Sequence, residues 1–294
     1  MKYLKENYLK ILVLGLFLLA GLFLANDSLV KKFRDLNKSV SDKLELIYVL
    51  SWQAKNINLE VSDLEIAKRI AHAGGGIDEM KYTNSLEALN ESYKNGFRFI
   101  EMDISWTHDK ELVMLHGWES EIEGLFGEKK GIRSLEEFKN FEMVGGLTQM
   151  SFDDVAQWLR NHKDAYLVTD VKNDNILTLD KIKEEYPDLQ SRIIPQIYFF
   201  KEYSSVVDLG YNKVIFTLYD ANYHPALVAG FIDIKNIFAL AMPTSQIALN
   251  KDLISKAKDL DIPIFTHTID SKKELVELEN LGIYGVYTNF LGIE

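Results

Sequence analysis

Short apolar runs alternate with polar, helix-like stretches along the chain from Arg69 onward. The apolar runs have the length of strands and are almost continuously hydrophobic, as strands covered on both faces are. They lie at 69–75, 97–106, 111–117, 165–171, 192–198, 213–219, 237–242, 262–268 and 284–289. The stretches between them predict helices at 84–95, 151–162, 178–185, 201–209, 223–230, 250–260 and 271–281. Buried strands that alternate with helices indicate a parallel sheet.

The number of apolar runs is one more than an eight-stranded barrel needs. A turn at His108-Asp109-Lys110 separates 97–106 from 111–117, so we expect these two runs to form a hairpin. The remaining alternation is that of a (β/α)8 TIM barrel, which typically takes about 250 residues. We therefore predict an α/β fold with a TIM barrel over 67–294.

Two of the predicted helices begin with a recognisable capping sequence. Ser151 precedes Asp153 and Asp154, and Ser271 lies three residues before Glu274. A serine followed by an acidic residue in the first turn is typical of a helix N-terminus.

The start of the chain predicts a membrane anchor. Residues 11–25 are uninterrupted apolar, and if Lys10 extends to the interface the segment reaches back to Tyr8 and has 18 residues. That is roughly enough to cross hydrocarbon about 30 Å thick. Cleavage after Ala25 would place Phe23 where signal peptidase prefers a small residue, so a retained helix is favoured over a cleaved signal peptide.

This interpretation divides the chain into three parts. Residues 1–27 are a cytosolic tip and transmembrane anchor, 28–66 a stalk or packing helix, and 67–294 the barrel. Basic residues lie on both sides of the apolar segment, and the positive-inside tendency favours an inner amino terminus. We expect a single-pass, membrane-anchored protein whose catalytic domain is extracytoplasmic.

Composition removes several classes of function. A net charge of −11 argues against a nucleic-acid partner, since binding phosphate backbones needs a basic face. The absence of cysteine excludes disulfides, thiolate zinc sites and cysteine nucleophiles. An apolar content of 47% suffices for a sizeable core.

Polar residues mark the carboxyl ends of the predicted strands, where TIM barrels place functional groups. Glu101 and Asp103 are two apart on one strand and face the same side, where two buried carboxylates repel unless a proton or cation intervenes. With Asp170 they form an all-oxygen set suited to Mg²⁺ or Ca²⁺. The alternative is a structural ion pair with Lys172 or Arg98.

Histidines at strand ends add candidate acid and base groups. A lone histidine such as His72 is commonly a core residue, but Gly74 to Gly76 follow it and allow close approach of a ligand. His116 ends the run at 111–117, beside the acidic set. Two histidines near a hard cation suggest general acid and base catalysis at a phosphoryl group. Two further strand-end residues, Gln196 and His267, are candidate substrate contacts, although His267 could equally pack.

The chain resembles the glycerophosphodiester phosphodiesterase family over about residues 66–294. The stretches that carry the resemblance are HAGG, TNSLEAL, GFRFIEMDISWTHDKELVMLHGWE, SFDDVAQWL and AYLVTDVK. The family's pattern is His-Arg-Gly, Pro-Glu-Asn-Thr, Glu-x-Asp, His-Asp, Glu-Ile-Lys, Trp-Thr-Val-Asn and Thr-Asp. By position, the resemblance implies a catalytic pair His72 and His116, metal ligands Glu101, Asp103 and Asp170, and substrate contacts at Asn84, Lys172 and His267.

Two departures from this pattern affect the phosphate site. Ala73 replaces an arginine that contacts phosphate, and Gly117 replaces the aspartate after the second histidine. A lost hydrogen bond to a charged group is worth roughly 1.5 to 3 kcal/mol, so Lys172 and the metal would have to compensate. The Asp170, Lys172 and His116-Gly117 details also look like spider-toxin-type sphingomyelinase D enzymes.

The resemblance implies a hydrolase of lipid metabolism. Its reaction would be metal-dependent hydrolysis, or intramolecular transfer, of a phosphodiester in a glycerophosphodiester, phospholipid or glycerol-phosphate-containing substrate. The alternative is a non-catalytic, membrane-anchored barrel that binds polyol phosphates, for which the two departures are the best support. A sugar hydrolase fits less well, because Glu101 and Asp103 share one strand face.

Overall fold

The computed structural model describes residues 40–44, 64–219, 223–233 and 235–293. Residues 40–44 are helical and belong to the first of two units, whereas the barrel forms in the second, and each is described by itself. The predicted anchor at 1–27 and most of the predicted stalk at 28–66 lie outside the described residues. Within the described part, no helix has the length and apolar character that crossing a bilayer requires.

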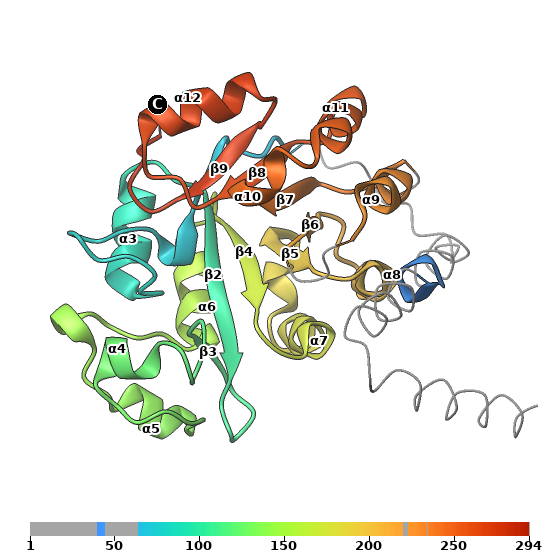
Figure 1. The fold of residues 1–294 in the computed structure, drawn as a ribbon. Coiled ribbons are helices and arrows are strands. Elements are labelled where there is room, and N and C mark those ends of the chain that lie inside the picture. Colours follow the sequence, from blue (N-terminus) through green and yellow to red (C-terminus); the bar gives the residue numbers. More distant parts are fainter. Residues whose placement is uncertain (1–39, 45–63, 220–222, 234, 294) are drawn as a thin grey trace, which may run out of the picture. The chain divides into compact units, whose positions relative to one another are not determined.

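Eight parallel strands close into a barrel, which confirms the predicted α/β fold (Figure 1). Each strand pairs with the next around the barrel, and the pairing of β1 with both β9 and β2 completes the circle. The strands are β1 (Arg69–Ala71), β2 (Phe99–Trp106), β4 (Tyr166–Val171), β5 (Ile193–Ile197), β6 (Ile215–Thr217), β7 (Ala239–Pro243), β8 (Ile264–His267) and β9 (Gly285–Thr288).

The ninth apolar run forms the predicted hairpin. Strand β3 (Leu112–Met114) runs antiparallel to β2, with Trp106 opposite Leu112 and Ile104 opposite Met114. The turn between them includes Lys110 at a φ of 70°, a left-handed conformation that suits a tight turn. The hairpin extends β2 beyond the barrel wall and leads the chain towards His116.

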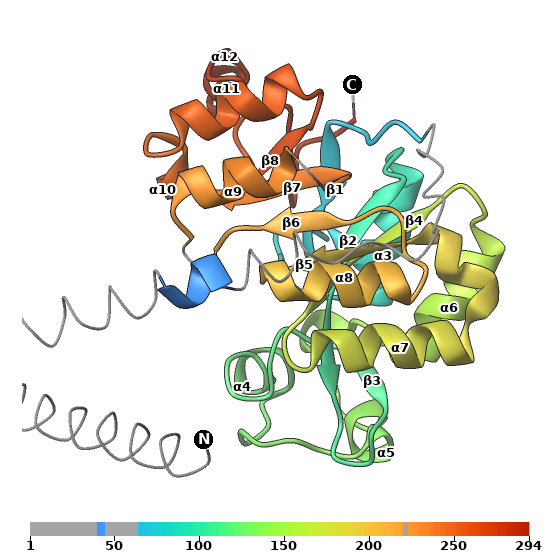
Figure 2. The same cartoon turned by 90° about the vertical axis from the view of Figure 1, so that its right-hand side faces the viewer.

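All seven predicted helices are present and surround the strands (Figure 2). Ser151 caps α6 in a complete capping box with Asp154, and the Ser271 side chain accepts a hydrogen bond from the Glu274 backbone at the start of α12. The helices are α3 (Leu86–Lys94), α6 (Phe152–Asn161), α7 (Asn175–Glu185), α8 (Phe200–Asp208), α9 (Pro225–Ile232), α11 (Lys251–Asp259) and α12 (Lys272–Asn280), and 3-10 turns occupy His72–Gly74, Val144–Gly146 and Pro187–Arg192.

A small lobe between β3 and α6 was not predicted. It contains α4 (Ile122–Phe126) and α5 (Leu135–Lys139), which lie beside the hairpin in both views (Figures 1 and 2). Trp118, Phe126 and Phe138 pack together at its centre. The lobe has its own apolar cluster and holds the segment that follows His116.

The floor of the barrel is closed by apolar side chains. Phe99, Phe265 and Tyr287 point into it, and Ile66, which is only 3% exposed, packs against them. The last residues assigned to the predicted stalk therefore contribute to the barrel core. Packing of this density leaves little room for additional atoms.

Gly285 is a test of that packing. A Cβ added there would lie 2.3 Å from the Lys68 carbonyl oxygen and 2.6 Å from Phe265 Cε1. We expect Gly285→Ala to lower the free energy of unfolding by about 1 to 3 kcal/mol, because the backbone oxygen cannot move aside cheaply. Urea denaturation measures the change.

The matched control is Gly230→Ala in helix α9, where no atom lies within 4 Å of the added Cβ. Alanine there should stabilise the protein by about 0.5 to 1 kcal/mol, since glycine in a helix interior is unfavourable. Equal effects of the two substitutions would show that the barrel floor is not closely packed.

Candidate active site

A cavity of about 670 Å³ opens at the carboxyl ends of the strands. Its volume is in the range of small-molecule sites. It is lined by His72, Tyr82, Asp103, His116, Glu121, Asp170, Val171, Lys172, Tyr219 and His267. Six of the nine predicted site residues are among them, and the other three, Glu101, Asn84 and Gln196, do not line the cavity.

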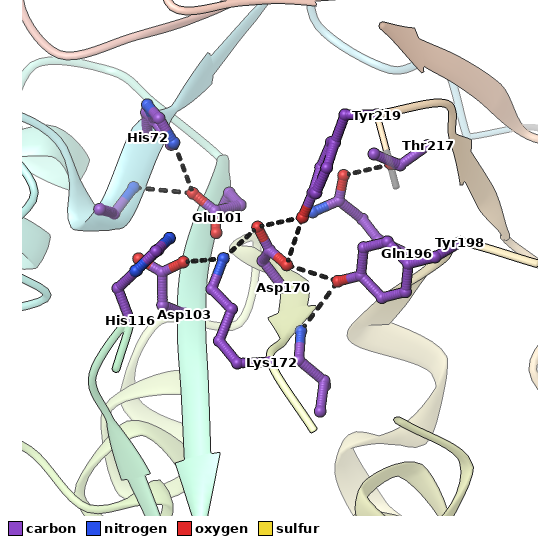
Figure 3. A network of polar contacts seen from close by, with 12 residues as sticks. His72, Glu101, Asp103, His116, Asp170, Lys172, Gln196, Tyr198, Thr217 and Tyr219 are labelled. Carbon is purple, nitrogen blue, oxygen red and sulfur yellow. Dashed lines mark hydrogen bonds and ion pairs between the residues drawn. The ribbon is translucent and has the colours of Figure 1, made fainter. Parts of the chain in front are cut away.

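Three carboxylates converge, and two of them, Asp103 and Asp170, line the cavity (Figure 3). Glu101 and Asp103 come from β2 and Asp170 from β4, and Asp103 is the register partner of Asp170. One ligand oxygen from each lies within 4.8 Å of the others, and all three residues are buried. The parallel register brings together residues that are far apart in the sequence.

Lys172 lies between two of these carboxylates. Its Nζ is 2.7 Å from Asp103 Oδ1 and 2.7 Å from Asp170 Oδ2. Although burial opposes the charged form, Asp103, Asp170 and Glu101 raise the pKa of Lys172 above its usual value. Of the two basic residues expected as ion-pair partners of the carboxylates, Lys172 forms the pair, whereas Arg98 pairs with Asp164.

Glu101 is the carboxylate that Lys172 leaves unpaired. Its Oε2 accepts a hydrogen bond of 2.8 Å from the Ala73 backbone, but its buried Oε1 has no partner. Burial and the charges of Asp103 and Asp170 raise the pKa of Glu101 well above its usual value. An orphaned buried oxygen within an all-oxygen, acid-rich set fits a divalent cation such as Mg²⁺ or Ca²⁺.

Asn84 orients one of these carboxylates. Its side-chain Nδ2 donates to Asp103 Oδ2 at 2.9 Å, and its Oδ1 accepts from the Asp103 backbone at 3.0 Å. The residue is 1% exposed and lies behind Asp103 rather than on the cavity wall. The structure therefore places this predicted substrate contact in a supporting position.

Gln196 also lies away from the cavity. Its Oε1 accepts hydrogen bonds from Thr217 at 2.7 Å and from Tyr287 at 3.1 Å, among the side chains inside the barrel. It is 3% exposed. Gln196 does lie near a strand end, as expected. Its side chain, however, bonds to residues of other strands and does not reach the cavity.

His72 is held in a defined orientation. Its Nδ1 is 2.7 Å from Thr268 Oγ1, which leaves Nε2 on the side of Glu101 Oε2 at 3.8 Å. Burial lowers the pKa of His72 even though Asp103 and Asp170 act in the opposite direction. A neutral imidazole with one nitrogen engaged is able to accept a proton at the other.

His116 lies at the mouth of the cavity beside an acidic partner. Its Nδ1 is 3.7 Å from Glu121 Oε1 and 3.4 Å from Ser120 Oγ. Burial raises the pKa of Glu121 to about 7, and Asp103 adds to the effect. The Glu121 Oε2 atom is buried without a partner. Glu121 was not identified from sequence, because it lies at the start of a helix too short to show a period.

Asp170 is fixed by two tyrosines that the sequence analysis did not assign to the site. The Tyr198 hydroxyl donates to Asp170 Oδ1 and accepts from the Val171 backbone at 3.0 Å. The Tyr219 hydroxyl lies 3.1 and 3.2 Å from the two Asp170 oxygens. Tyr198 and Tyr219 are the last residues of the apolar runs predicted at 192–198 and 213–219, so both lie at predicted strand ends.

His267 lines the cavity. This agrees with its expected place as a substrate contact rather than as a packing residue. Its ring meets that of Tyr219 edge-on at 5.6 Å, and burial lowers its pKa to about 4. It is therefore neutral at physiological pH. Asp270, three residues later, accepts hydrogen bonds from the Asn289 backbone and side chain at 2.7 and 2.9 Å, which joins the segment after β8 to the segment after β9.

The raised pKa of Glu121 makes a prediction for stability. The folded protein holds a proton on Glu121 up to about pH 7, whereas an unfolded glutamate releases it near pH 4.5. Its contribution to stability is therefore present below pH 4.5 and is lost as the pH rises through 7. Because glutamine does not titrate, Glu121→Gln should gain stability relative to the wild type between pH 5 and pH 8.

Urea denaturation at both pH values, in protein freed of divalent cations, measures this difference. A difference between variant and wild type that is the same at both values would show that the pKa of Glu121 is not raised.

Comparison with known proteins agrees with this geometry. The sequence model of the glycerophosphoryl diester phosphodiesterase family matches residues 72–227. Among curated proteins, none is significantly similar in sequence.

Solved structures of such enzymes share the fold at low sequence identity. The enzyme of Thermotoga maritima is 16% identical, with 77% of this chain and 96% of that chain covered and a TM-score of 0.61. That of Parabacteroides distasonis is 17% identical, with coverages of 76% and 92% and a TM-score of 0.61. A phosphodiesterase of Oleispira antarctica, solved in complex with the product sn-glycerol-3-phosphate, is 15% identical, with coverages of 76% and 93% and a TM-score of 0.61. The family match covers more than half of the chain, so the protein belongs to the glycerophosphoryl diester phosphodiesterase family and is a phosphodiester hydrolase of that type.

Proposed function

We propose that the protein hydrolyses a glycerophosphodiester, free or as part of a lipid or envelope polymer, in a metal-dependent reaction with two histidines as acid and base. The observation that carries the proposal is the buried set of three carboxylates, of which Asp103 and Asp170 line the same cavity as His72 and His116. The product found in the Oleispira antarctica enzyme supports a glycerol-phosphate product here.

Glu101, Asp103 and Asp170 would hold the divalent cation. When bound, it would supply positive charge that polarises the phosphoryl oxygens. Lys172 forms ion pairs with Asp103 and Asp170, and Asn84 and Tyr198 fix the direction of their oxygens. The carboxylates are thereby preorganised for binding, which is the arrangement that gives metal sites their affinity.

The two histidines would transfer the protons. An attacking hydroxyl, from water or from the substrate's neighbouring carbon, forms the new P–O bond as one histidine takes its proton. The bond from phosphorus to the leaving oxygen breaks, and the other histidine protonates that alkoxide. His72 would act at Nε2, because Thr268 engages Nδ1.

Lys172 would also replace the arginine that the family has at Ala73. Ala73 is fully buried, and its backbone is used to bind Glu101. Lys172 is the cation that lines the cavity within the described part of the chain. Its ammonium would neutralise charge on the non-bridging oxygens as the transition state forms.

The apolar segment at 8–25 would tether the enzyme to a membrane, with the barrel outside the cytoplasm. A tethered enzyme meets lipids and envelope polymers at high local concentration. Digestion of intact cells with an external protease tests this location. Loss of the barrel supports it, and protection of the barrel in intact but not lysed cells contradicts it.

Product analysis tests the reaction itself. The full chain, supplied with Mg²⁺ or Ca²⁺, should convert a glycerophosphodiester to a glycerol phosphate monoester, or to a cyclic phosphate if the substrate's own hydroxyl attacks. ³¹P NMR distinguishes the three species. Binding of diesters without conversion would instead favour the non-catalytic barrel, for which the missing arginine and aspartate are the supporting observation.

A further inference from the structure

A second cavity, of about 310 Å³, shares no lining residue with the first. It lies between the loop after β1, the end of α3 and the segment after β9. Its lining residues are Gly76, Ser92, Asn95, Phe97, Asn289, Phe290, Gly292 and Ile293. The volume is at the lower end of the range of small-molecule sites, and the proposed reaction does not use this cavity.

Close contacts hold the walls of this second cavity together. A Cβ added at Gly76 would lie 2.1 Å from Phe290 Cε1, so the Phe290 ring packs directly on the Gly76 backbone. The Gly76 N–H donates to the Asn289 carbonyl at 2.8 Å. These contacts join the loop after β1 to the segment after β9, and the cavity is thus built into the fold.

Asn289 brings an unused hydrogen-bond acceptor to the second cavity. The residue is 6% exposed, its Nδ2 donates to Asp270 Oδ2 at 2.9 Å, and its backbone N–H donates to Asp270 Oδ1 at 2.7 Å. Its Oδ1 is buried and has no hydrogen-bond partner among the described residues. A buried amide oxygen without a donor is unfavourable, so a ligand or an ordered water is expected to donate to it.

The lining of the second cavity excludes charged ligands. None of the lining residues has a charged side chain. Arg69 and Asp270 each bond to a lining residue, but neither lines the cavity. A phosphate would therefore meet no cation there and an ammonium group no carboxylate, and burial of an unpaired charge is costly.

The other polar side chains of the lining are also able to accept hydrogen bonds. Ser92 Oγ donates to the Gly74 carbonyl at 2.7 Å, and Asn95 Nδ2 donates to Glu91 Oε1 at 3.1 Å. Because their donors are engaged, each of the two residues offers an oxygen to a ligand. An uncharged molecule with several hydroxyl donors fits this set of acceptors.

We propose that the second cavity binds a small uncharged polyol, of the size of glycerol or erythritol, with one ligand hydroxyl donating to Asn289 Oδ1. The aromatic and aliphatic side chains of the lining would pack against the carbon chain of the ligand. This site is separate from the catalytic cavity and does not depend on the reaction proposed there.

An NMR titration of the metal-free full chain with glycerol tests this site. Two buried asparagine amides report on the two cavities: Asn289 is bonded to Asp270, and Asn84 is bonded to Asp103 beside the catalytic cavity. The Asn289 amide signal should shift and saturate, with a dissociation constant in the millimolar range that suits so small a ligand. A signal that shifts only at Asn84, or that shifts at Asn289 without saturating, overturns the proposal.

Two further ligands define the chemistry that the site recognises. 1,2-Dimethoxyethane has as many non-hydrogen atoms as glycerol but no hydroxyl group, so it should leave the Asn289 amide signal unchanged. Equal binding of the two compounds overturns the requirement for a hydroxyl donor. Methyl glucoside models the sugar of a headgroup, and tighter binding of the glucoside than of glycerol would assign the hydroxyl groups to a sugar instead of a free polyol.

Asn289→Leu removes the acceptor with little change in volume. The Gly292 backbone amide, which lines the second cavity, then serves as the reporter. The dissociation constant for glycerol should rise roughly two- to tenfold, the range of one uncharged hydrogen bond. Asn280→Leu is the matched control, because Asn280 is exposed at the end of α12 and lines neither cavity. Unchanged affinity in Asn289→Leu, or an equal loss in the control, overturns the role of Asn289.

A crystal of the wild type covers the case in which Asn289→Leu does not fold. Soaked with glycerol at its measured dissociation constant, the crystal should show a ligand hydroxyl within about 3.2 Å of Asn289 Oδ1. An ordered water alone at this oxygen, with no polyol in the second cavity, overturns the proposal.

Discussion

Replacing His72 by alanine should lower kcat for a glycerophosphodiester by about 10²- to 10⁴-fold, the range that a positioned acid or base contributes. The imidazole is held through Thr268 at 2.7 Å, and burial keeps it neutral near pH 7, so the loss should be in kcat. Steady-state kinetics with the divalent cation in excess measure the effect. KM should change less, because the ring transfers a proton rather than anchoring the substrate.

His108→Ala is the control for this result. His108 is exposed in the turn between β2 and β3, and its backbone, not its side chain, bonds to Arg133. Its activity should equal that of the wild type. Activity of His72→Ala within a few-fold of the wild type, in protein of unchanged thermal stability, would exclude His72 as an acid or base.

The second large effect concerns the cation. Adding Mg²⁺ or Ca²⁺ to metal-free protein at 100 times the dissociation constant should raise the free energy of unfolding by about 2.7 kcal/mol. For a domain of this size that corresponds to a rise in Tm of roughly 5 to 10 °C. In Glu101→Gln this shift should be largely lost, since the ligand oxygen without a partner is removed.

Without the cation, Glu101→Gln should not lower the stability of the protein. Burial and two neighbouring carboxylates raise the pKa of Glu101. Ionisation of Glu101 at higher pH therefore lowers the free energy of unfolding. Glutamine removes that charge, and metal-free Glu101→Gln should therefore be at least as stable as the wild type at pH 8. Thermal denaturation with and without the cation checks both statements, and an undiminished cation shift in Glu101→Gln would rule out this site.

The barrel could be predicted because its strands and helices are long enough to show their periods. The runs at 97–106 and 165–171 contain β2 and β4, and the apolar pattern located each to within two residues. The helices α4, α5 and α10 (Thr244–Ile247) have four or five residues, too few for a 3.6-residue period to emerge. The unpredicted lobe consists of such short elements.

The cluster of three carboxylates could be predicted for a similar reason. Residues two apart on a strand share a face, and parallel neighbours bring Asp103 beside Asp170. The sequence position of a strand end gives the direction of a side chain but not its depth, which is why Gln196 was expected in the cavity and lies below it.

The hydrogen-bond partners of the site residues could not be predicted. Thr268 and Tyr198 end the predicted runs 262–268 and 192–198, but they contact residues 196 and 28 positions away, and no local pattern specifies such pairs. Glu121 is the most informative of these, because Gly117 lacks the carboxylate that the family has after the second histidine. Glu121 Oε1 brings a carboxylate to within 3.7 Å of His116 from a different position in the chain.

The cation dependence of turnover tests the central claim most directly. A glycerophosphodiester is followed by ³¹P NMR with the full chain in EDTA, and then with Mg²⁺ or Ca²⁺ in excess of the chelator. We predict no conversion in EDTA and conversion on addition of the cation, with Glu101→Gln inactive in both. Equal conversion in EDTA would contradict the role of the three carboxylates, and no conversion with either cation would contradict hydrolysis of this substrate class.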